Sequence, residues 1–249
     1  MSTWPQISYA YDGTFAGFLT CTAESFQHRE YPFYFFSPGE TQFSLYPLRD
    51  ITTNEARARE MYRTLEQKLS RNAKNLVTMS FLTCLPQKER HIFDYIYLGF
   101  HSGIQDLTDD RVLILTNAVR HLRNEAHLFK GFVRFSDYDG ILVGEITPKN
   151  RVLPLLRTHF CDRFTGESFL LYDRTHREAL CYASGMWKLF PLETLDLVTP
   201  DLREETCRKL WKSFYETIAI ESRYNPKLRM THMPKRYWEN MTEFFPDAK

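Results

Sequence analysis

The sequence predicts an α+β fold, with an antiparallel sheet formed mainly by residues 129–191 and helices segregated from it. Two observations lead to this prediction. Apolar residues recur at helical spacing among charged ones over about 53–128, which predicts a helical subdomain there. The period then becomes that of strands, around an Asp-Gly turn at 139–140. No Gly/Ser linker or internal repeat divides the chain, so we expect residues 1–249 to form one compact domain.

The first fifty residues predict one helix between short strands. Residues 7–11 alternate like a strand that ends in an Asp-Gly turn, and Thr14 is then a suitable N-cap for the helix. Residues 31–39 are rich in proline and aromatic side chains, which indicates a loop, and 42–48 form a possible second strand.

The remaining elements follow from the same periodicities. They are helices within 53–128 at 76–84, 88–104 and 110–128, a hairpin at 129–147, a helix at 152–164, strands at 169–172, 179–182 and 187–190, and a last helix from Asp201 to about Arg223. Alternating charges such as Arg63 and Glu66 indicate a solvated helix face. Leu210, Phe214 and Ile218 lie along one face of the last helix.

Composition argues against several classes of protein. The chain has ten glycines in 249 residues and neither a G-x-G-x-x-G nor a P-loop motif. Its five cysteines are scattered without a C-x-x-C pair, and no H-E-x-x-H is present, so we expect no metal, no iron–sulfur cluster and no other cofactor. No basic segment precedes an apolar run at the N-terminus, and no apolar run approaches the roughly 20 residues that cross a bilayer. We therefore expect a cytoplasmic protein without a membrane partner.

The strongest functional signal is the segment 221–238. It carries five Lys or Arg residues against one acid, in a chain whose net charge is only +1, and aromatic residues lie among them. Cations that neutralise phosphates beside rings that stack on bases are typical of nucleic-acid binding. The alternative is a tail that packs its rings on the core, with Trp238 as an anchor. The candidate contact residues here are Arg223, Asn225, Arg229, Lys235, Arg236, Tyr237 and Trp238.

A second candidate surface lies in the expected hairpin. On a strand, Lys130, Phe132 and Arg134 would share one face, because side chains alternate with a period of two. Two cations around a ring would form a nucleic-acid platform at the centre of the sheet, with Val133 facing the core. Alternatively, Arg134 pairs with an acid such as Glu145 across the hairpin.

The next helix ends with a histidine and an arginine on one side. His159 and Arg163 are four residues apart and, with Arg134, are placed to converge on one anionic group. The alternative is an interior histidine with satisfied hydrogen bonds and a cation that stabilises the helix C-terminus.

Catalysis is indicated less strongly. His159 or His127 together with Asp173 would form an acid–base pair for a nucleic-acid-directed hydrolase or transferase. Asp173 with the nearby His176 is a further acid–base candidate, although an Asp and a His between two strands are also ordinary turn residues. A third possibility is a protein-binding adaptor that uses the aromatic tail.

Taken together, these segments resemble a bacterial family of unknown function labelled "probable DNA metabolism protein". The matching residues run through the chain in order: Tyr11-Asp12-Gly13-Thr14-Phe15, Gly17-Phe18-Leu19, His127 to Phe135, Leu153-Pro154, Leu156, His159-Phe160, Arg163-Phe164, Asn225-Pro226-Lys227-Leu228, Met233-Pro234 and Arg236-Tyr237-Trp238. The resemblance implies DNA as partner, together with a radical S-adenosylmethionine (radical SAM) protein similar to spore photoproduct lyase. Some relatives are joined to a uracil-DNA-glycosylase-superfamily domain, and without a G-E-A-P-G segment this chain resembles the free-standing form. The resemblance implies no catalytic residues. We therefore expect an accessory nucleic-acid-binding protein in DNA repair or base modification.

Overall fold

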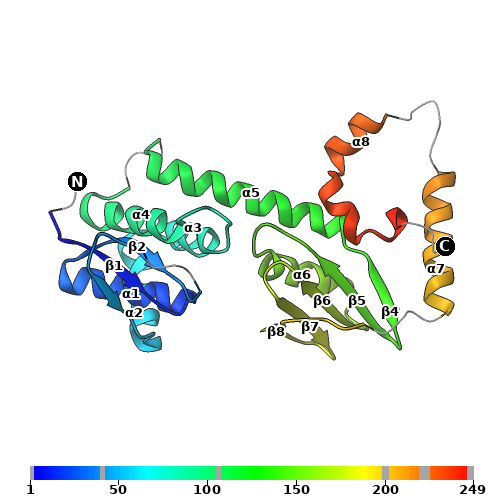
Figure 1. The fold of residues 1–249 in the computed structure, drawn as a ribbon, viewed down its shortest axis with the longest axis horizontal. Coiled ribbons are helices and arrows are strands. Elements are labelled where there is room, and N and C mark those ends of the chain that lie inside the picture. Colours follow the sequence, from blue (N-terminus) through cyan, green and yellow to red (C-terminus); the bar gives the residue numbers. More distant parts are fainter. Residues whose placement is uncertain (1–2, 40–42, 105–107, 198–201, 219–224, 246–249) are drawn as a thin grey trace. The chain divides into compact units, whose positions relative to one another are not determined.

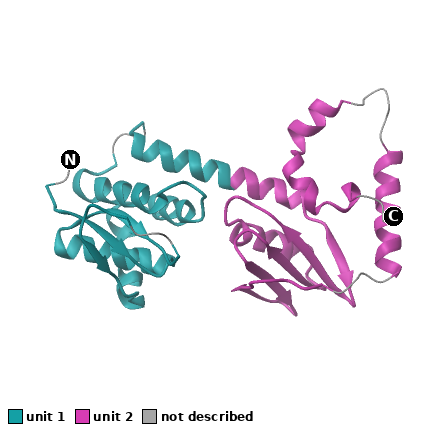
Figure 2. Ribbon diagram, viewed as in Figure 1, with its two compact units in different colours: residues 1–122 teal, residues 123–249 magenta. Residues whose placement is uncertain are grey.

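The chain divides into two compact units, residues 1–122 and 123–249, with the boundary inside helix α5 (Asp110–Phe132) (Figure 2). Each unit contains a sheet and its own helices, so the α+β class is confirmed. The expectation of one domain with a helical subdomain at about 53–128 stays a prediction. The computed structural model describes residues 3–39, 43–104, 108–197, 202–218 and 225–245.

Unit 1 contains a three-stranded parallel sheet. Its strands are β1 (Gln6–Ala10), β2 (Tyr31–Phe36) and β3 (Leu48–Asp50), in the order β2-β1-β3 (Figure 1). Helix α1 (Phe15–His28) links β1 to β2, and such a crossover returns the chain to a parallel strand. The strand expected at 42–48 is wrong over its described part, because β3 begins only at Leu48.

The loop predicted over 31–39 is also wrong, because residues 31–36 form β2. Pro32 lacks the N–H that a strand ladder uses. Since β2 lies at the edge of the sheet, a proline is tolerated there. The aromatic residues around it favour an extended strand more strongly than the proline opposes it.

The predicted start of α1 is confirmed. The hydroxyl of Thr14 accepts a hydrogen bond from the backbone N–H of Gly17 at 2.9 Å. Asp12 accepts from the backbone N–H of Thr14 at 2.9 Å and from the hydroxyl of Thr53 at 2.7 Å. A Cβ on Gly17 would meet Asp12 Oδ1 at 2.2 Å, so only glycine fits at this position.

Unit 1 also contains helices α2 (Glu55–Lys68), α3 (Arg71–Phe81) and α4 (Lys88–Ser102), and the part of α5 up to Leu122. Ala58, Met61 and Leu65 of α2 are buried and its charged residues other than Arg57 are exposed, as expected for a solvated face. Helix α3 begins before the predicted residue 76, because the hydroxyl of Ser70 caps it by accepting from Ala73 N at 3.0 Å.

Unit 2 contains a five-stranded sheet whose strands follow one another in chain order. They are β4 (Phe135–Tyr138), β5 (Ile141–Ile146), β6 (Ser168–Asp173), β7 (Glu178–Ala183) and β8 (Met186–Pro191). The sheet is mixed, since β5 and β6 pair in parallel and all other pairs are antiparallel. Helix α6 (Leu153–Arg163) is the crossover that makes this parallel pair, so the prediction of an antiparallel sheet is wrong at this pair.

The Asp-Gly turn of the hairpin is confirmed, because Asp139 and Gly140 both have positive φ, at 51° and 83°. The predicted start of the hairpin at residue 129 is wrong. Helix α5 continues to Phe132, so Lys130 and Phe132 are helical and Val133 and Arg134 lie in the connection to β4. The sheet-face platform therefore does not exist, and β4 is an edge strand with β6 at the centre.

The remaining described helices are α7 (Leu202–Thr217) and α8 (Pro226–His232), followed by short 3₁₀ segments at Lys235–Asn240 and Thr242–Phe244. Tyr237 and Met241 in this last part are buried. Residues 235–244 thus form regular 3₁₀ turns that bury both of these side chains. Within the described ranges, no helix is both long and apolar enough to cross a membrane.

Candidate nucleic-acid interface

Unit 2 contains a pocket of about 620 Å³ that is lined by cations and aromatic rings. Its walls come from the ends of α5 and α6, from β4 and β5, and from α7. The charged and aromatic residues that line it are Lys130, Arg134, Arg163, Arg208, Glu204, Phe135, Phe160, Phe164 and Trp211. The pocket therefore brings together two residues that the sequence placed in one site, Arg134 and Arg163.

The aromatic wall of this pocket is rigid. The ring of Phe135 packs edge-on against Phe160 and Phe164, with centroids 5.4 and 5.1 Å apart. Such edge-to-face contacts are the favoured geometry for aromatic pairs. On the side of α7, the indole of Trp211 lies 5.4 Å from the guanidinium carbon of Arg134.

Two of the four cations are neutralised by carboxylates. Arg134 donates two hydrogen bonds to the buried Glu243, at 2.6 and 3.1 Å. Arg208 donates to Glu204 at 2.8 Å and to the hydroxyl of Ser136 at 2.6 Å. Arg134 thus pairs with an acid, as the alternative expected, but this acid is Glu243 of the C-terminal segment and not one across the hairpin.

The expected partner Glu145 is instead bound by Arg174, which also pairs with Glu239 at 3.2 Å. Glu145 is therefore engaged elsewhere on the sheet. The sequence distance between Arg134 and Glu243 explains why local spacing did not reveal their pairing.

The other two cations, Lys130 and Arg163, have no carboxylate partner. In the part of the chain that the structure describes, neither side chain makes a hydrogen bond or an ion pair. Lys130 is in the last turn of α5 and Arg163 is the last residue of α6, and both are exposed. Their positions suit the partial negative charge of a helix C-terminus. They also leave two unneutralised charges in one pocket.

His159 lies close to these two cations. Burial of its ring lowers the pKa of His159 below the ordinary value of 6.5, and the positive charges of Lys130 and Arg163 lower it further. Its Nε2 atom is buried without a hydrogen-bond partner. The backbone of Lys130 hydrogen-bonds the same ring, so the alternative of an interior histidine with satisfied hydrogen bonds is met in part, by this bond but not at Nε2. His159 itself is not among the residues that line the pocket.

Arg236 and Tyr237, by contrast, take part in packing. Arg236 pairs with Glu125 at 3.0 Å, and that carboxylate is 3% exposed and also accepts from the backbone N–H of Asn150 at 2.9 Å. Tyr237 is buried against the ring of Phe129, with centroids 4.9 Å apart. Phe132 packs on the same tyrosine at 5.1 Å. These contacts give each of the three predicted contact residues, Phe132, Arg236 and Tyr237, a structural partner.

The indole of Trp238 is also engaged within unit 2. It stacks on Phe244 with centroids 4.4 Å apart and an interplanar angle of 13°, and its N–H donates to the carbonyl of Met233 at 3.0 Å. The guanidinium carbon of Arg229 lies 5.0 Å from its ring, and Lys235 Nζ lies 5.9 Å away. These contacts favour the interpretation of Trp238 as an anchor.

Two further predicted residues remain. Asn225 caps α8, because its side-chain oxygen accepts from the backbone N–H of Leu228 at 3.0 Å. Arg223 lies outside the described residues.

Of the pairs considered for catalysis, the structure joins Asp173 to His176 and not to His127 or His159 within the described residues. Asp173 is fully buried and its carboxylate binds His176 Nδ1 at 2.7 Å, in the turn between β6 and β7. Among the described residues, no hydrogen bond or ion pair joins Asp173 to His127 or His159. The same part of the chain contains no cluster of three side chains suited to hold a metal ion.

The apolar side of helix α7 is exposed to solvent. Leu210, Phe214 and Ile218, the last of them one residue beyond the helix, are 65%, 53% and 60% exposed. The side of α7 that faces the pocket carries Glu204, Arg208 and Trp211, at spacings of four and three residues. The sequence interpretation missed Arg208 and Trp211 as pocket residues, although the Glu204–Arg208 spacing is a visible signal of a helix pair.

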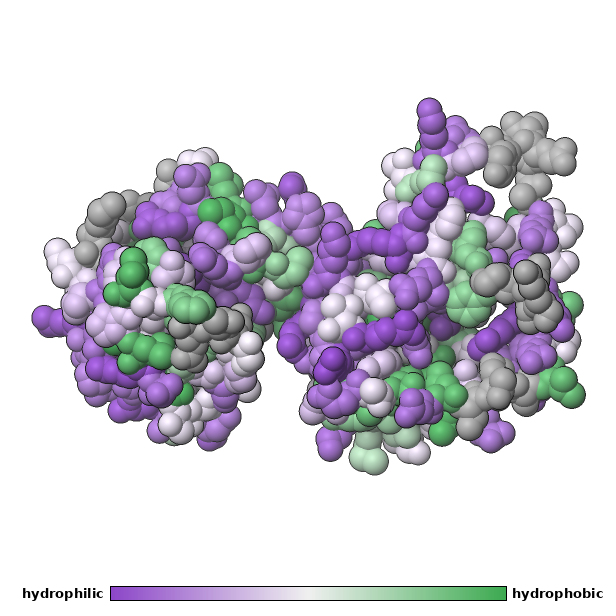
Figure 3. Space-filling model, in the orientation of Figure 1, coloured by the Kyte–Doolittle hydropathy of each residue, from purple (hydrophilic) through white to green (hydrophobic). Residues whose placement is uncertain are grey.

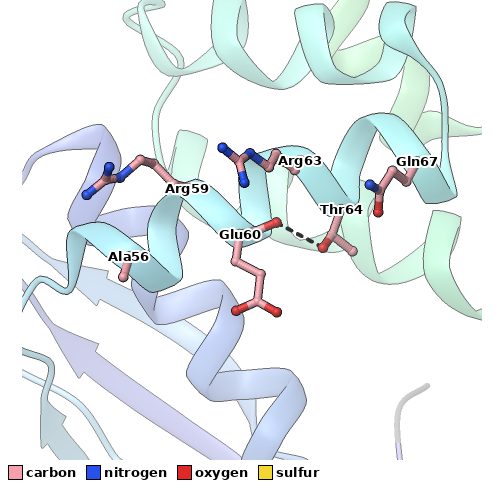
Figure 4. A pocket seen from close by; sticks show the side chains of 6 residues that line it. All are labelled: Ala56, Arg59, Glu60, Arg63, Thr64 and Gln67. Carbon is pink, nitrogen blue, oxygen red and sulfur yellow. Dashed lines mark hydrogen bonds between the residues drawn. The ribbon is translucent and has the colours of Figure 1, made fainter.

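A second hollow, of about 390 Å³, lies on α2 in unit 1 (Figure 4). All of its lining residues come from this one helix: Ala56, Arg59, Glu60, Arg63, Thr64 and Gln67. Figure 4 shows the hydroxyl of Thr64 donating to the backbone carbonyl of Glu60, at 2.9 Å. A polar depression along a single helix is typical of a solvated face, and it contains no aromatic ring.

Comparison with known families gives one match. Residues 86–243, more than half of the chain, match DUF4130, a domain of unknown function. The chain belongs to this family. No curated protein matches it. The DUF4130 segment contains the whole basic pocket, from Lys130 to Thr242, and excludes the hollow on α2. Within this DUF4130 protein, the pocket is therefore the candidate site that belongs to the shared domain.

Proposed function

We propose that this DUF4130 protein is a nucleic-acid-binding accessory protein in DNA repair or base modification, and that the pocket in unit 2 is its contact surface. The observation that carries the proposal is the pair of unneutralised cations, Lys130 and Arg163, in a pocket lined with aromatic rings. Cations bind phosphates and release counterions, and rings stack on bases of any sequence. The other two cations, Arg134 and Arg208, hold the pocket walls through their carboxylate partners.

The size of the pocket supports a single-stranded ligand. A volume of about 620 Å³ lies within the range of small-molecule sites, roughly 300–1,000 Å³. It accommodates part of a single strand, such as one nucleotide, whereas a duplex would have to bind outside it. We therefore place a splayed or single-stranded segment in the pocket.

Salt-dependent DNA binding tests this proposal. Fluorescence anisotropy with a labelled single-stranded oligonucleotide, repeated across salt concentrations, gives the affinity and its log–log salt slope. For a single strand each lost phosphate contact reduces the slope by about 0.7, so Lys130→Ala with Arg163→Ala should reduce it by about 1.4. Lys188→Ala, at an exposed position on β8, is the matched control and should leave the slope unchanged. Equal slopes for the wild type and the double variant would refute the assignment of the pocket.

The radical SAM enzyme as working partner is part of the same proposal, and its support is the resemblance of the sequence. The corresponding experiment is the same titration with and without that enzyme. A DNA affinity that is unchanged by the enzyme, together with no direct binding between the two proteins, would contradict this part alone.

A protein-binding adaptor is the second candidate function, and the exposed side of α7 favours it. Leu210, Phe214 and Ile218 form an apolar stripe on the outside of this helix, and Figure 3 shows hydrophobic surface over parts of α7. Exposed apolar stripes of this kind mark protein contacts. If this function is correct, Phe214→Ser should weaken partner binding and leave the salt slope for DNA unchanged.

A further inference from the structure

We infer that the pocket in unit 2 binds a phosphate monoester, the terminal phosphate of a single strand, with the adjoining base against the aromatic wall. This inference rests on the proposed function and specifies its ligand. Three features of the pocket support it: the net charge, the position of the two unpaired cations and the aromatic wall. A nucleotide inside a strand would present phosphodiesters to the same surface.

Charge is the first argument. Four cations surround the pocket and two carboxylates neutralise two of them, so a net charge of two remains: Lys130, Arg134, Arg163 and Arg208 against Glu204 and Glu243. A phosphate monoester carries about −1.5 to −2 charges at pH 7, and three oxygens that accept hydrogen bonds. A phosphodiester carries one negative charge. The excess in the pocket therefore matches a monoester.

The position of the free charges is the second argument. Lys130 and Arg163 line the same pocket although they belong to different helices. Two unpaired cations in one pocket suit one dianionic group better than two monoanionic groups spaced along a strand.

The ring-lined part of the pocket is the third argument. Phe135, Phe160 and Phe164 pack on one another and give a fixed apolar wall, and Trp211 lies on the side of α7. A base joined to a phosphate has the size and the flat apolar face to fill this space. A phosphate alone would leave the aromatic wall unused.

The test compares three single-stranded oligonucleotides of one sequence with an internal label. One carries a 5′-phosphate, one a 3′-phosphate and one only hydroxyl ends. We expect at least one phosphorylated strand to bind the full-length protein about tenfold more tightly than the hydroxyl strand. Arg163→Ala and Lys130→Ala should each remove most of this advantage, and Lys188→Ala should keep it. The preferred end identifies which terminus enters the pocket.

The outcomes separate the two proposals. Equal affinity for all three strands, with a normal salt slope, would overturn the terminal-phosphate inference and leave the proposed function intact. Failure of every strand to bind would overturn the proposed function as well. A free nucleoside monophosphate that binds while no strand does would overturn both the strand end and the nucleic-acid function.

Cysteine alkylation gives a second readout that needs no substitution. Cys207 lines the pocket and is exposed, and Cys84 in unit 1 is an exposed control. A saturating phosphorylated strand should slow alkylation of Cys207 several-fold and leave Cys84 unchanged, as measured by mass spectrometry. Equal alkylation of Cys207 with and without the strand would place the ligand elsewhere and refute the inference.

Discussion

Replacement of Trp238 by alanine distinguishes an anchor from a base-stacking residue. The structure gives the indole three partners: the ring of Phe244, the guanidinium of Arg229 and the carbonyl of Met233. Losing them should cost about 0.5–1.5 kcal/mol for the stacked pair, about 0.5–1 for the cation–π contact and about 0.5–1.5 for the hydrogen bond. With some loss of apolar burial, we expect Trp238→Ala to lower the free energy of unfolding by about 2–4 kcal/mol.

Two measurements on the same variant are required. Denaturant unfolding gives the stability, and anisotropy with single-stranded DNA gives the affinity of the folded fraction. The structure predicts reduced stability and unchanged affinity. A stacking role would instead cost about 1–3 kcal/mol of binding with intact stability, and that result would refute the anchor.

Trp187 provides a matched control for this experiment. It is 48% exposed on β8, and its ring lies 4.3 Å from the guanidinium carbon of Arg157. It therefore has a cation–π contact like that of Trp238, but no stacked ring or indole hydrogen bond is recorded for it within the described residues. Trp187→Ala should lower the free energy of unfolding by only about 0.5–1 kcal/mol.

Three further predictions concern the pocket and its surroundings. Glu243→Gln leaves Arg134 without its carboxylate, so unfolding experiments should show a loss of about 1–3 kcal/mol while the salt slope of DNA binding becomes steeper. NMR titration should place the pKa of His159 below 6.5. The free energy of unfolding that the wild type gains over His159→Asn should be at its full value above pH 6.5 and should decline as the pH falls below it. The reason is that the unfolded state then binds more protons than the folded state. A constant difference between pH 7.5 and 5 would contradict the lowered pKa. Elemental analysis of the purified protein should find no stoichiometric zinc or iron; near-stoichiometric metal would overturn this.

Much of the fold follows from local patterns. Helical periodicity located α4 and α6 to within a few residues, and the Asp-Gly turn located the hairpin between β4 and β5. Parallel pairing was missed in both units, although the predicted helix at 152–164 lies between two predicted strands and is long enough to be the crossover of a parallel pair. The end of α5 was missed because the apolar spacing through Phe129 continues the helix into a segment that also alternates like a strand.

The candidate site was predictable only in part. Arg134 and Arg163 were expected to meet, and they line one pocket, although Arg134 lies in a connection and not on a strand. The partners that decide which cations remain free are distant in sequence, as in the pairs Arg134–Glu243 and Arg236–Glu125. The sequence shows where each arginine lies but not which distant acid neutralises it. Arg236 and Arg163 were therefore equally good candidates for nucleic-acid contact from the sequence alone.

The orientation of α7 connects the two candidate functions. The helix is held to unit 2 by polar contacts, through Glu204 to the backbone of Asp137 and through Arg208 to Ser136, while its apolar stripe faces outward. An amphipathic helix normally buries its apolar side, and α7 does the reverse with Leu210 and Phe214. This arrangement places Arg208 and Trp211 in the pocket wall. In the two proposed functions, nucleic-acid binding would use one side of α7 and partner binding would use the other, so they would not compete for the same residues.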